Sequence, residues 1–168
     1  MWSSTKNKLK TISFSQALVK NMPSDGGLYI PTSYFNVKEN GIKDFKDFAK
    51  VMLRPYFKGD ILEPYLNDIC DNAFDFEVPL KKLNEKTFIL ELFHGPTLAF
   101  KDIGAKFLAE CFHKLYVLDK KKKDRVVLVA TSGDTGAAVA SAFYRKEGIK
   151  VVLLFPKDKI SARQKKQL

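Results

Sequence analysis

The sequence has 168 residues, of which 45% are hydrophobic and 29% charged, and its formal net charge at pH 7 is +10. This length and hydrophobic content suffice for one globular core, or for one domain and part of a second, and they exclude a disordered chain. No apolar run is long enough to span a bilayer, and the start, MWSSTKNKLK, lacks the apolar core of a secretory signal, so we expect a cytoplasmic protein without a membrane partner.

The positive charge is scattered along the chain, except at Lys120–Lys123 and between Lys157 and Lys166. No aromatic-interleaved basic stripe, zinc-finger spacing or helix-turn-helix signature accompanies it, so we expect no nucleic-acid partner. The same positive field would attract a small anionic substrate. Cys70 and Cys111 lack metal-ligand spacing, which predicts two buried free thiols and no metal site.

The first elements in chain order belong to a mostly helical region over residues 1–83. A short helix is predicted over Phe14–Lys20, followed by a turn and the short apolar run Leu28–Ile30. Apolar residues then recur at helical spacing from Phe45, and Pro55 is expected to end this second helix. A third helix is predicted over Ile61–Ala73.

From residue 84 onward, strands alternate with helices. The predicted strands are Thr87–Phe93, Val126–Ala130 and Ile149–Phe155, and the predicted helices are Lys101–Tyr116 and Ala137–Lys146. This alternation predicts an α/β fold with a parallel sheet and right-handed crossovers. The continuous apolar run of Val126–Ala130 is typical of a strand covered on both faces. Ligands of such sheets bind at the carboxyl ends of strands, which is where Lys101 and the turn after Ala130 fall.

The segment ELFHGPTLAFKD, residues 91–102, carries Lys101 out of an apolar strand into a predicted helix start. Lys101 follows Leu98–Phe100 in a segment that we expect to be largely buried. Burial penalises a charged ammonium and lowers its pKa, which would make a neutral, nucleophilic amine available for a Schiff base. His94, in the same segment, is either a contact of a cofactor or substrate or a hydrogen-bonded structural histidine.

A second segment with chemical potential is the turn TSGDTG, residues 131–136. Its glycines, including Gly133, allow the backbone to approach a ligand, while Ser132 and Thr135 supply hydroxyls beside a helix N-terminus, so the turn can form an anion cradle. Asp134 is an acceptor and belongs near a donor. The alternative is an ordinary helix-capping turn. The spacing fits neither a nucleotide phosphate loop, nor a dinucleotide fingerprint, nor a nucleophile elbow.

Taken together, several segments resemble threonine synthases, a family of pyridoxal-phosphate enzymes with the tryptophan synthase β-like fold. The segments are SFSQAL, PSDGGLYIP, LFHGPTLAFKD, TSGDTGAAVASAFY and KVVLLFPKDKIS, and they cover nearly all of the chain in the expected order. The resemblance implies a threonine synthase-type N-terminal region over residues 1–83. It also implies that residues 84–168 form the first part of a three-layer, pyridoxal-phosphate-dependent α/β catalytic domain, truncated at its C-terminus.

The activity that this resemblance implies is the conversion of O-phospho-L-homoserine and water to L-threonine and phosphate. Pyridoxal 5'-phosphate would be held as an aldimine by Lys101, which would also move protons at the substrate carbons. Asp134 would approach the ring hydroxyl of the cofactor, although many relatives have asparagine there. The residues implied in binding the substrate α-carboxylate are Ser132, Gly133 and Thr135. The residues implied as supports of the site are His94, Thr97 and Asp102, the last more as a helix cap than as a proton donor.

Because threonine synthases are much longer, and their loop for the cofactor phosphate is expected downstream, we expect the 168-residue chain alone to be inactive and to bind the cofactor weakly. Two alternatives stay open. A serine or threonine dehydratase shares the lysine and the loop but eliminates water from a hydroxy amino acid, and the DGGLYIP segment weighs against it. A noncatalytic binding or regulatory relative would keep the fold, and Lys101 would then be a structural lysine.

Overall fold

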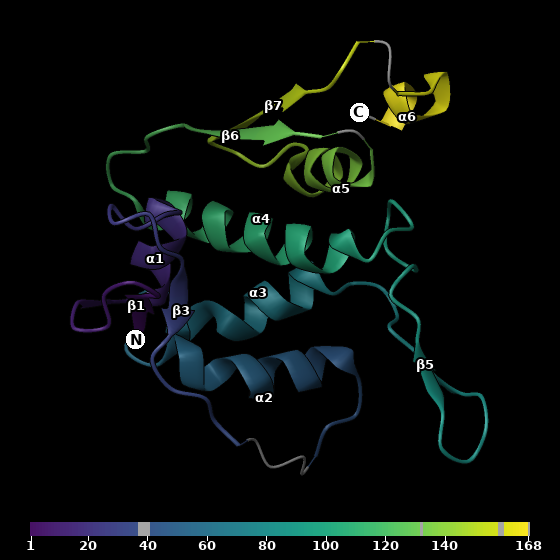
Figure 1. Ribbon diagram of the computed structural model, residues 1–168, viewed down its shortest axis with the longest axis horizontal. Helices are drawn as coiled ribbons and strands as arrows, with labels where there is room; N and C mark the ends of the chain where they lie inside the picture. The colour runs from purple at the N-terminus through teal and green to yellow at the C-terminus, as the bar shows by residue number, and fades with distance from the viewer. Residues whose placement is uncertain (37–40, 132, 158–159, 168) are drawn as a thin grey trace. The chain divides into compact units, whose positions relative to one another are not determined.

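A computed structural model describes residues 1–36, 41–131, 133–157 and 160–167 of the chain. The chain forms two compact units, Met1–Cys70 and Asp71–Leu168 (Figure 1). The boundary expected between residues 83 and 84 stays a prediction. No helix among these residues is long and apolar enough to cross a membrane. Cys70 and Cys111 are both buried, as expected.

The first unit contains a small antiparallel sheet with the strand order β2-β1-β3. Its elements are β1 (Trp2–Ser4), β2 (Thr11–Ile12), α1 (Phe14–Lys20), β3 (Tyr29–Pro31), α2 (Phe45–Phe57), the 3-10 turn η1 (Glu63–Tyr65) and α3 (Leu66–Ala73), which runs past the boundary of the unit. Helix α1 has the predicted bounds because a capping box starts it. The Ser13 N–H donates to Gln16 Oε1 at 3.1 Å, and the Gln16 N–H donates to Ser13 Oγ at 3.4 Å.

Two predictions for this unit were wrong in detail. Pro55 lies inside α2, which continues to Phe57. A proline removes only the N–H of its own position, so in the last turn of a helix it leaves most of the hydrogen-bond ladder intact. The helix predicted over Ile61–Ala73 is divided into η1 and α3, and the division follows Pro64, which lies inside η1.

The second unit begins with a hairpin and continues as an α/β arrangement. Its elements are β4 (Leu80–Lys82), β5 (Phe88–Leu90), α4 (Lys101–Leu118), β6 (Arg125–Ala130), α5 (Asp134–Phe143), β7 (Ile149–Leu154) and α6 (Ala162–Gln167). Strands β6 and β7 pair in parallel over their whole length, from Arg125 opposite Ile149 to Ala130 opposite Leu154. Helix α5 connects these two strands, packs against them and also packs against α4 (Figure 1). The predicted α/β fold class is therefore present.

The strand predicted over Thr87–Phe93 is shorter and has a different partner. It forms β5, which pairs antiparallel with β4, so that Leu80 lies opposite Leu90. The chain reverses just before it, where Asn84 Oδ1 accepts the Lys86 N–H at 3.0 Å. Two strands so close in sequence pair locally, and the parallel sheet of the described residues is therefore the β6–β7 pair.

Small residues allow α4 and α5 to pack closely. The buried cluster consists of Ala105 and Ala109 from α4 and Ala138, Ala142 and Phe143 from α5. Along β6, burial alternates, and Val126 and Leu128 are 63% and 64% exposed. The expectation that this strand is covered on both faces is therefore wrong for the described residues, because the packing of α5 and α4 covers one face only.

Candidate active site

Lys101 is the first residue of α4, and its side chain is 31% exposed. Its Nζ lies 3.9 Å from Asp134 Oδ2 and 4.5 Å from the centre of the Phe100 ring. The expectation of a largely buried segment is wrong, since Leu98 and Phe100 are 74% and 61% exposed. Leu98 has a left-handed φ of 59°, and its N–H donates to the carbonyl of Gly95, so the chain forms an exposed turn before Lys101.

Asp102 connects this turn to the helix. It is fully buried, and its two carboxylate oxygens accept the N–H and the hydroxyl of Thr97 at 2.9 Å and 2.6 Å. The N-cap position of α4 is Phe100, so Asp102 lies in the first turn of the helix and its carboxylate is bonded back to the preceding turn. A negative charge is favourable at this end of a helix. A Cβ on Gly95 would lie 2.5 Å from Asp102 Oδ2, so glycine is required there.

The loop after β6 is organised by Thr131. Its N–H donates to the carbonyl of Leu154 at 2.8 Å, and its Oγ1 accepts the N–H groups of Gly133 at 3.1 Å and Gly136 at 3.0 Å. These two amides are therefore bonded within the loop. Thr131 was not predicted as a site residue, although a threonine directly after a strand and before a glycine-rich turn is a signal for such bonds. Ser132, predicted to bind substrate, lies outside the described residues.

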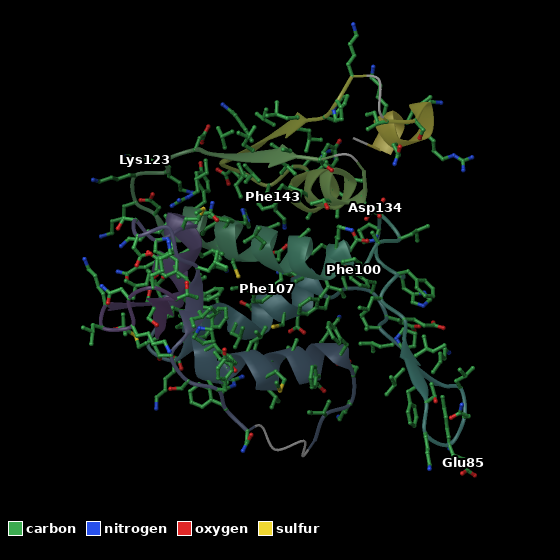
Figure 2. The ribbon with its side chains drawn as sticks, viewed as in Figure 1. Glu85, Phe100, Phe107, Lys123, Asp134 and Phe143 are labelled. Carbon is green, nitrogen blue, oxygen red and sulfur yellow. The ribbon has the colours of Figure 1, made fainter. Side chains whose placement is uncertain are left out.

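A pocket of about 420 Å³ brings the two segments together. Its lining residues are Lys101, Ala130, Thr131, Gly133, Asp134, Thr135 and Gln164. Figure 2 shows the labelled side chains of Phe100, which precedes Lys101, and Asp134 at the same end of α4, in agreement with the distance from Lys101 to Asp134. Gln164, from α6, was missed in the sequence, where the only signal was the capping-box spacing of Ser161 and Gln164.

Three residues predicted as supports do not line this pocket. Thr97 and Asp102 are hydrogen-bonded to each other, and Asp102 directly follows the pocket residue Lys101. His94 Nε2 lies 2.8 Å from Glu91 Oε2, and the His94 ring packs on Phe93 with ring centres 4.7 Å apart. His94 is therefore paired with a carboxylate from its own segment.

Family models match both parts of the chain. Residues 1–74 match the model described as threonine synthase N terminus, and residues 76–168 match the model of pyridoxal-phosphate dependent enzymes. The threonine synthase of Haemophilus influenzae is 40% identical over 164 residues, which are 96% of this chain and 38% of that protein. The threonine synthase of Escherichia coli is 37% identical over 166 residues, with the same two coverages.

Solved structures of threonine synthases are also similar to this chain. A threonine synthase from Brucella melitensis with bound PLP has a TM-score of 0.86 and 34% identity, over 99% of this chain and 38% of the other. The yeast threonine synthase has a TM-score of 0.88 and 33% identity, over 99% of this chain and 37% of the other. The chain thus spans well under half the length of the relatives that it matches.

Proposed function

This chain belongs to the family of pyridoxal-phosphate-dependent enzymes, and from that membership we propose that it serves the threonine synthase reaction. The reaction converts O-phospho-L-homoserine and water to L-threonine and phosphate. The observation that carries the proposal is the shared pocket, in which Lys101 Nζ lies 3.9 Å from the carboxylate of Asp134 in the loop after β6. The names of the two bacterial relatives support the choice of reaction.

The residues at the pocket fit pyridoxal phosphate. A volume of about 420 Å³ lies within the usual range for small-ligand sites, roughly 300–1,000 Å³, and Lys101 is one of the lining residues. When bound, the cofactor supplies an electron sink that stabilises negative charge on substrate carbons. Lys101 would hold the cofactor's aldehyde and, when its amine is free, would take and return protons at those carbons.

The loop after β6 supplies the proposed contacts to the substrate α-carboxylate and to the ring hydroxyl of the cofactor. Gly133 and Thr135 line the pocket, and together with Ser132 they would bind the α-carboxylate of the substrate. The Gly133 N–H is bonded to Thr131 Oγ1, so Gly133 would contribute the close backbone approach that a missing side chain allows. Asp134, an acceptor close to Lys101 Nζ, would approach the ring hydroxyl of the cofactor. The bonds that Thr131 makes to two loop amides would hold the loop in one shape before ligand binds, which lowers the entropic cost of binding.

The remaining proposals concern the surroundings of the site. Thr97 and Asp102 would support it by fixing the turn before Lys101, while the role of His94 as a support rests on its sequence position alone. We also propose the division into an N-terminal region over residues 1–83 and a catalytic region over residues 84–168, and a cytoplasmic location. The expectation that the 168-residue chain alone is inactive stays a prediction, which a phosphate-release assay tests.

An absorbance titration with pyridoxal phosphate tests the proposed function. At cofactor concentrations high enough to saturate weak binding, we expect a visible band from the parent protein and from Lys106→Ala, a control on the same helix whose lysine pairs with Asp75. Lys101→Ala should show no band. O-phospho-L-homoserine should then change the band, whereas L-serine should not. A response to L-serine alone would favour a dehydratase, and a band that survives in Lys101→Ala would contradict the proposed role of the lysine.

A further inference from the structure

Gln164 is held in one orientation by its own helix. The Ser161 N–H donates to Gln164 Oε1 at 2.9 Å, and the Gln164 N–H donates to Ser161 Oγ at 3.2 Å, which is a capping box at the start of α6. A backbone N–H can only donate, so the side-chain atom that faces Ser161 must be the oxygen. The other end of the amide is therefore Nε2, which carries two hydrogen-bond donors.

The Nε2 end lies beside the loop of the proposed site. Gln164 lines the same pocket as Lys101, and a Cβ added to Gly133 would lie 3.2 Å from Gln164 Nε2. Among the residues that the structure describes, no side chain or carbonyl accepts a hydrogen bond from Nε2. The capping box thus presents a pair of oriented donors to the pocket, next to the glycine that allows the loop to come close.

The charges around this point favour an anion. Helix α6 has the sequence ARQKKQ, with the exposed side chains of Arg163, Lys165 and Lys166 and no acidic residue. Within the pocket lining, the charges of Lys101 and Asp134 offset each other. The local field therefore comes mainly from the cations of α6, and it attracts anionic groups toward the side of the pocket where Gln164 lies.

We propose that Gln164 Nε2 donates a hydrogen bond to an anionic oxygen of the substrate, and that Gln164 is a specificity-determining residue of this pocket. The inference deepens the proposed function and rests on it for the identity of the substrate. The shared chemistry is an ionised oxygen, which in O-phospho-L-homoserine belongs to either the carboxylate or the phosphate. A neutral amide donor suits both groups and adds direction to the less directional attraction of the lysines.

A purely structural role for Gln164 predicts a different result, and the chain contains a matched control. Gln16 makes the same pair of capping bonds with Ser13 at the start of α1, in the first unit, and does not line the pocket. Gln164→Glu and Gln16→Glu both keep the acceptor for the capping N–H, because glutamate also forms a capping box. Only Gln164→Glu replaces donors at the pocket with an ionised acceptor.

The experiment follows the side-chain NH₂ signals of both glutamines by NMR while inorganic phosphate, acetate or O-phospho-L-homoserine is added. We expect the Gln164 signals to shift saturably and the Gln16 signals to stay in place. Gln164→Glu should weaken the binding of the most effective probe by about 10-fold to 100-fold, followed through the Thr135 amide, because a bond to an ionised group is lost and repulsion is added. Gln16→Glu should bind that probe as the parent does.

The three probes separate the two sources of the anionic oxygen. A response to acetate but not to phosphate assigns the carboxylate, and the reverse assigns the phosphate. Gln164 signals that respond to none of the probes, or a Gln164→Glu protein that binds them as tightly as the parent, would overturn the inference. The titration needs no cofactor, so failure of the Lys101-dependent absorbance band with a persistent Gln164 response would reject the proposed function and keep the anion contact.

Discussion

Replacement of Asp102 by alanine should destabilise the second unit through the turn that precedes Lys101. The carboxylate is fully buried and accepts two hydrogen bonds from Thr97, at 2.9 Å and 2.6 Å. A bond to a charged group contributes about 1.5–3 kcal/mol, so two independent bonds would sum to about 3–6 kcal/mol. The loss should be smaller than this sum, because alanine also removes the cost of burying a charge. We expect a loss of about 2–4 kcal/mol.

Urea unfolding monitored by circular dichroism measures this loss, with Asp119→Ala as control. Asp119 follows the other end of α4, and its carboxylate accepts one exposed bond from the Lys121 N–H at 2.9 Å, so its removal should cost less than about 1 kcal/mol. Thr97→Val removes the hydroxyl bond and keeps the N–H bond. The stability loss of the double variant Thr97→Val/Asp102→Ala should therefore be smaller than the sum of the two single losses by about 1 kcal/mol or more. A loss below about 1 kcal/mol for Asp102→Ala, or full additivity, would show that the bonds from Thr97 do not stabilise the turn.

Two further predictions concern other parts of the chain. Gly148→Ala should cost at least about 2 kcal/mol in urea unfolding, because φ is +74° and the new Cβ would lie 2.1 Å from the Tyr116 ring; an unchanged midpoint would contradict this. Hydrogen bonds from the Gly27 N–H and, to a smaller extent, from the Ser4 hydroxyl lower the pKa of Asp25 from its ordinary value of 3.8. The stability that the ionised Asp25 contributes is therefore full above pH 3.8 and is lost as the pH falls through the lowered pKa. Asp25→Asn should therefore flatten the acid response of the Ser4 and Gly27 NMR signals, and an acid response equal to that of the parent would exclude this linkage.

The sequence predicted those helices and strands that are determined by interactions between residues close together in the chain. Helix α1 has its predicted bounds because Ser13 and Gln16 form a capping box within four residues. The strands β6 and β7 and the intervening helix α5 follow from apolar runs separated by glycine-containing turns. The partner of β5 could not be predicted in the same way, since its apolar residues fit a parallel sheet or a hairpin equally well, and only the fold decides which edge they meet.

For the candidate site as well, the sequence indicated residue types but not tertiary contacts. The sequence indicated Lys101 and the loop residues Gly133–Thr135 through their residue types, and the structure places them around one pocket. The exposure of Leu98 and Phe100 depends on which elements fold over the turn, which no local pattern contains. Gln164 reaches the pocket only because α6 folds back toward the loop after β6, so its proximity to Gly133 is a tertiary property.

Lys101 is the amine that we propose binds pyridoxal phosphate. The most direct measurement incubates the protein with pyridoxal phosphate, reduces the mixture with borohydride and maps the modified lysines by mass spectrometry as cofactor concentration is lowered. We expect Lys101 to be modified at the lowest concentrations and to be protected by O-phospho-L-homoserine. Lys106 and Lys146, whose amines donate hydrogen bonds to carboxylates, should react only at high concentration. Modification of Lys101 no stronger than that of these lysines, without protection by the substrate, would contradict the claim.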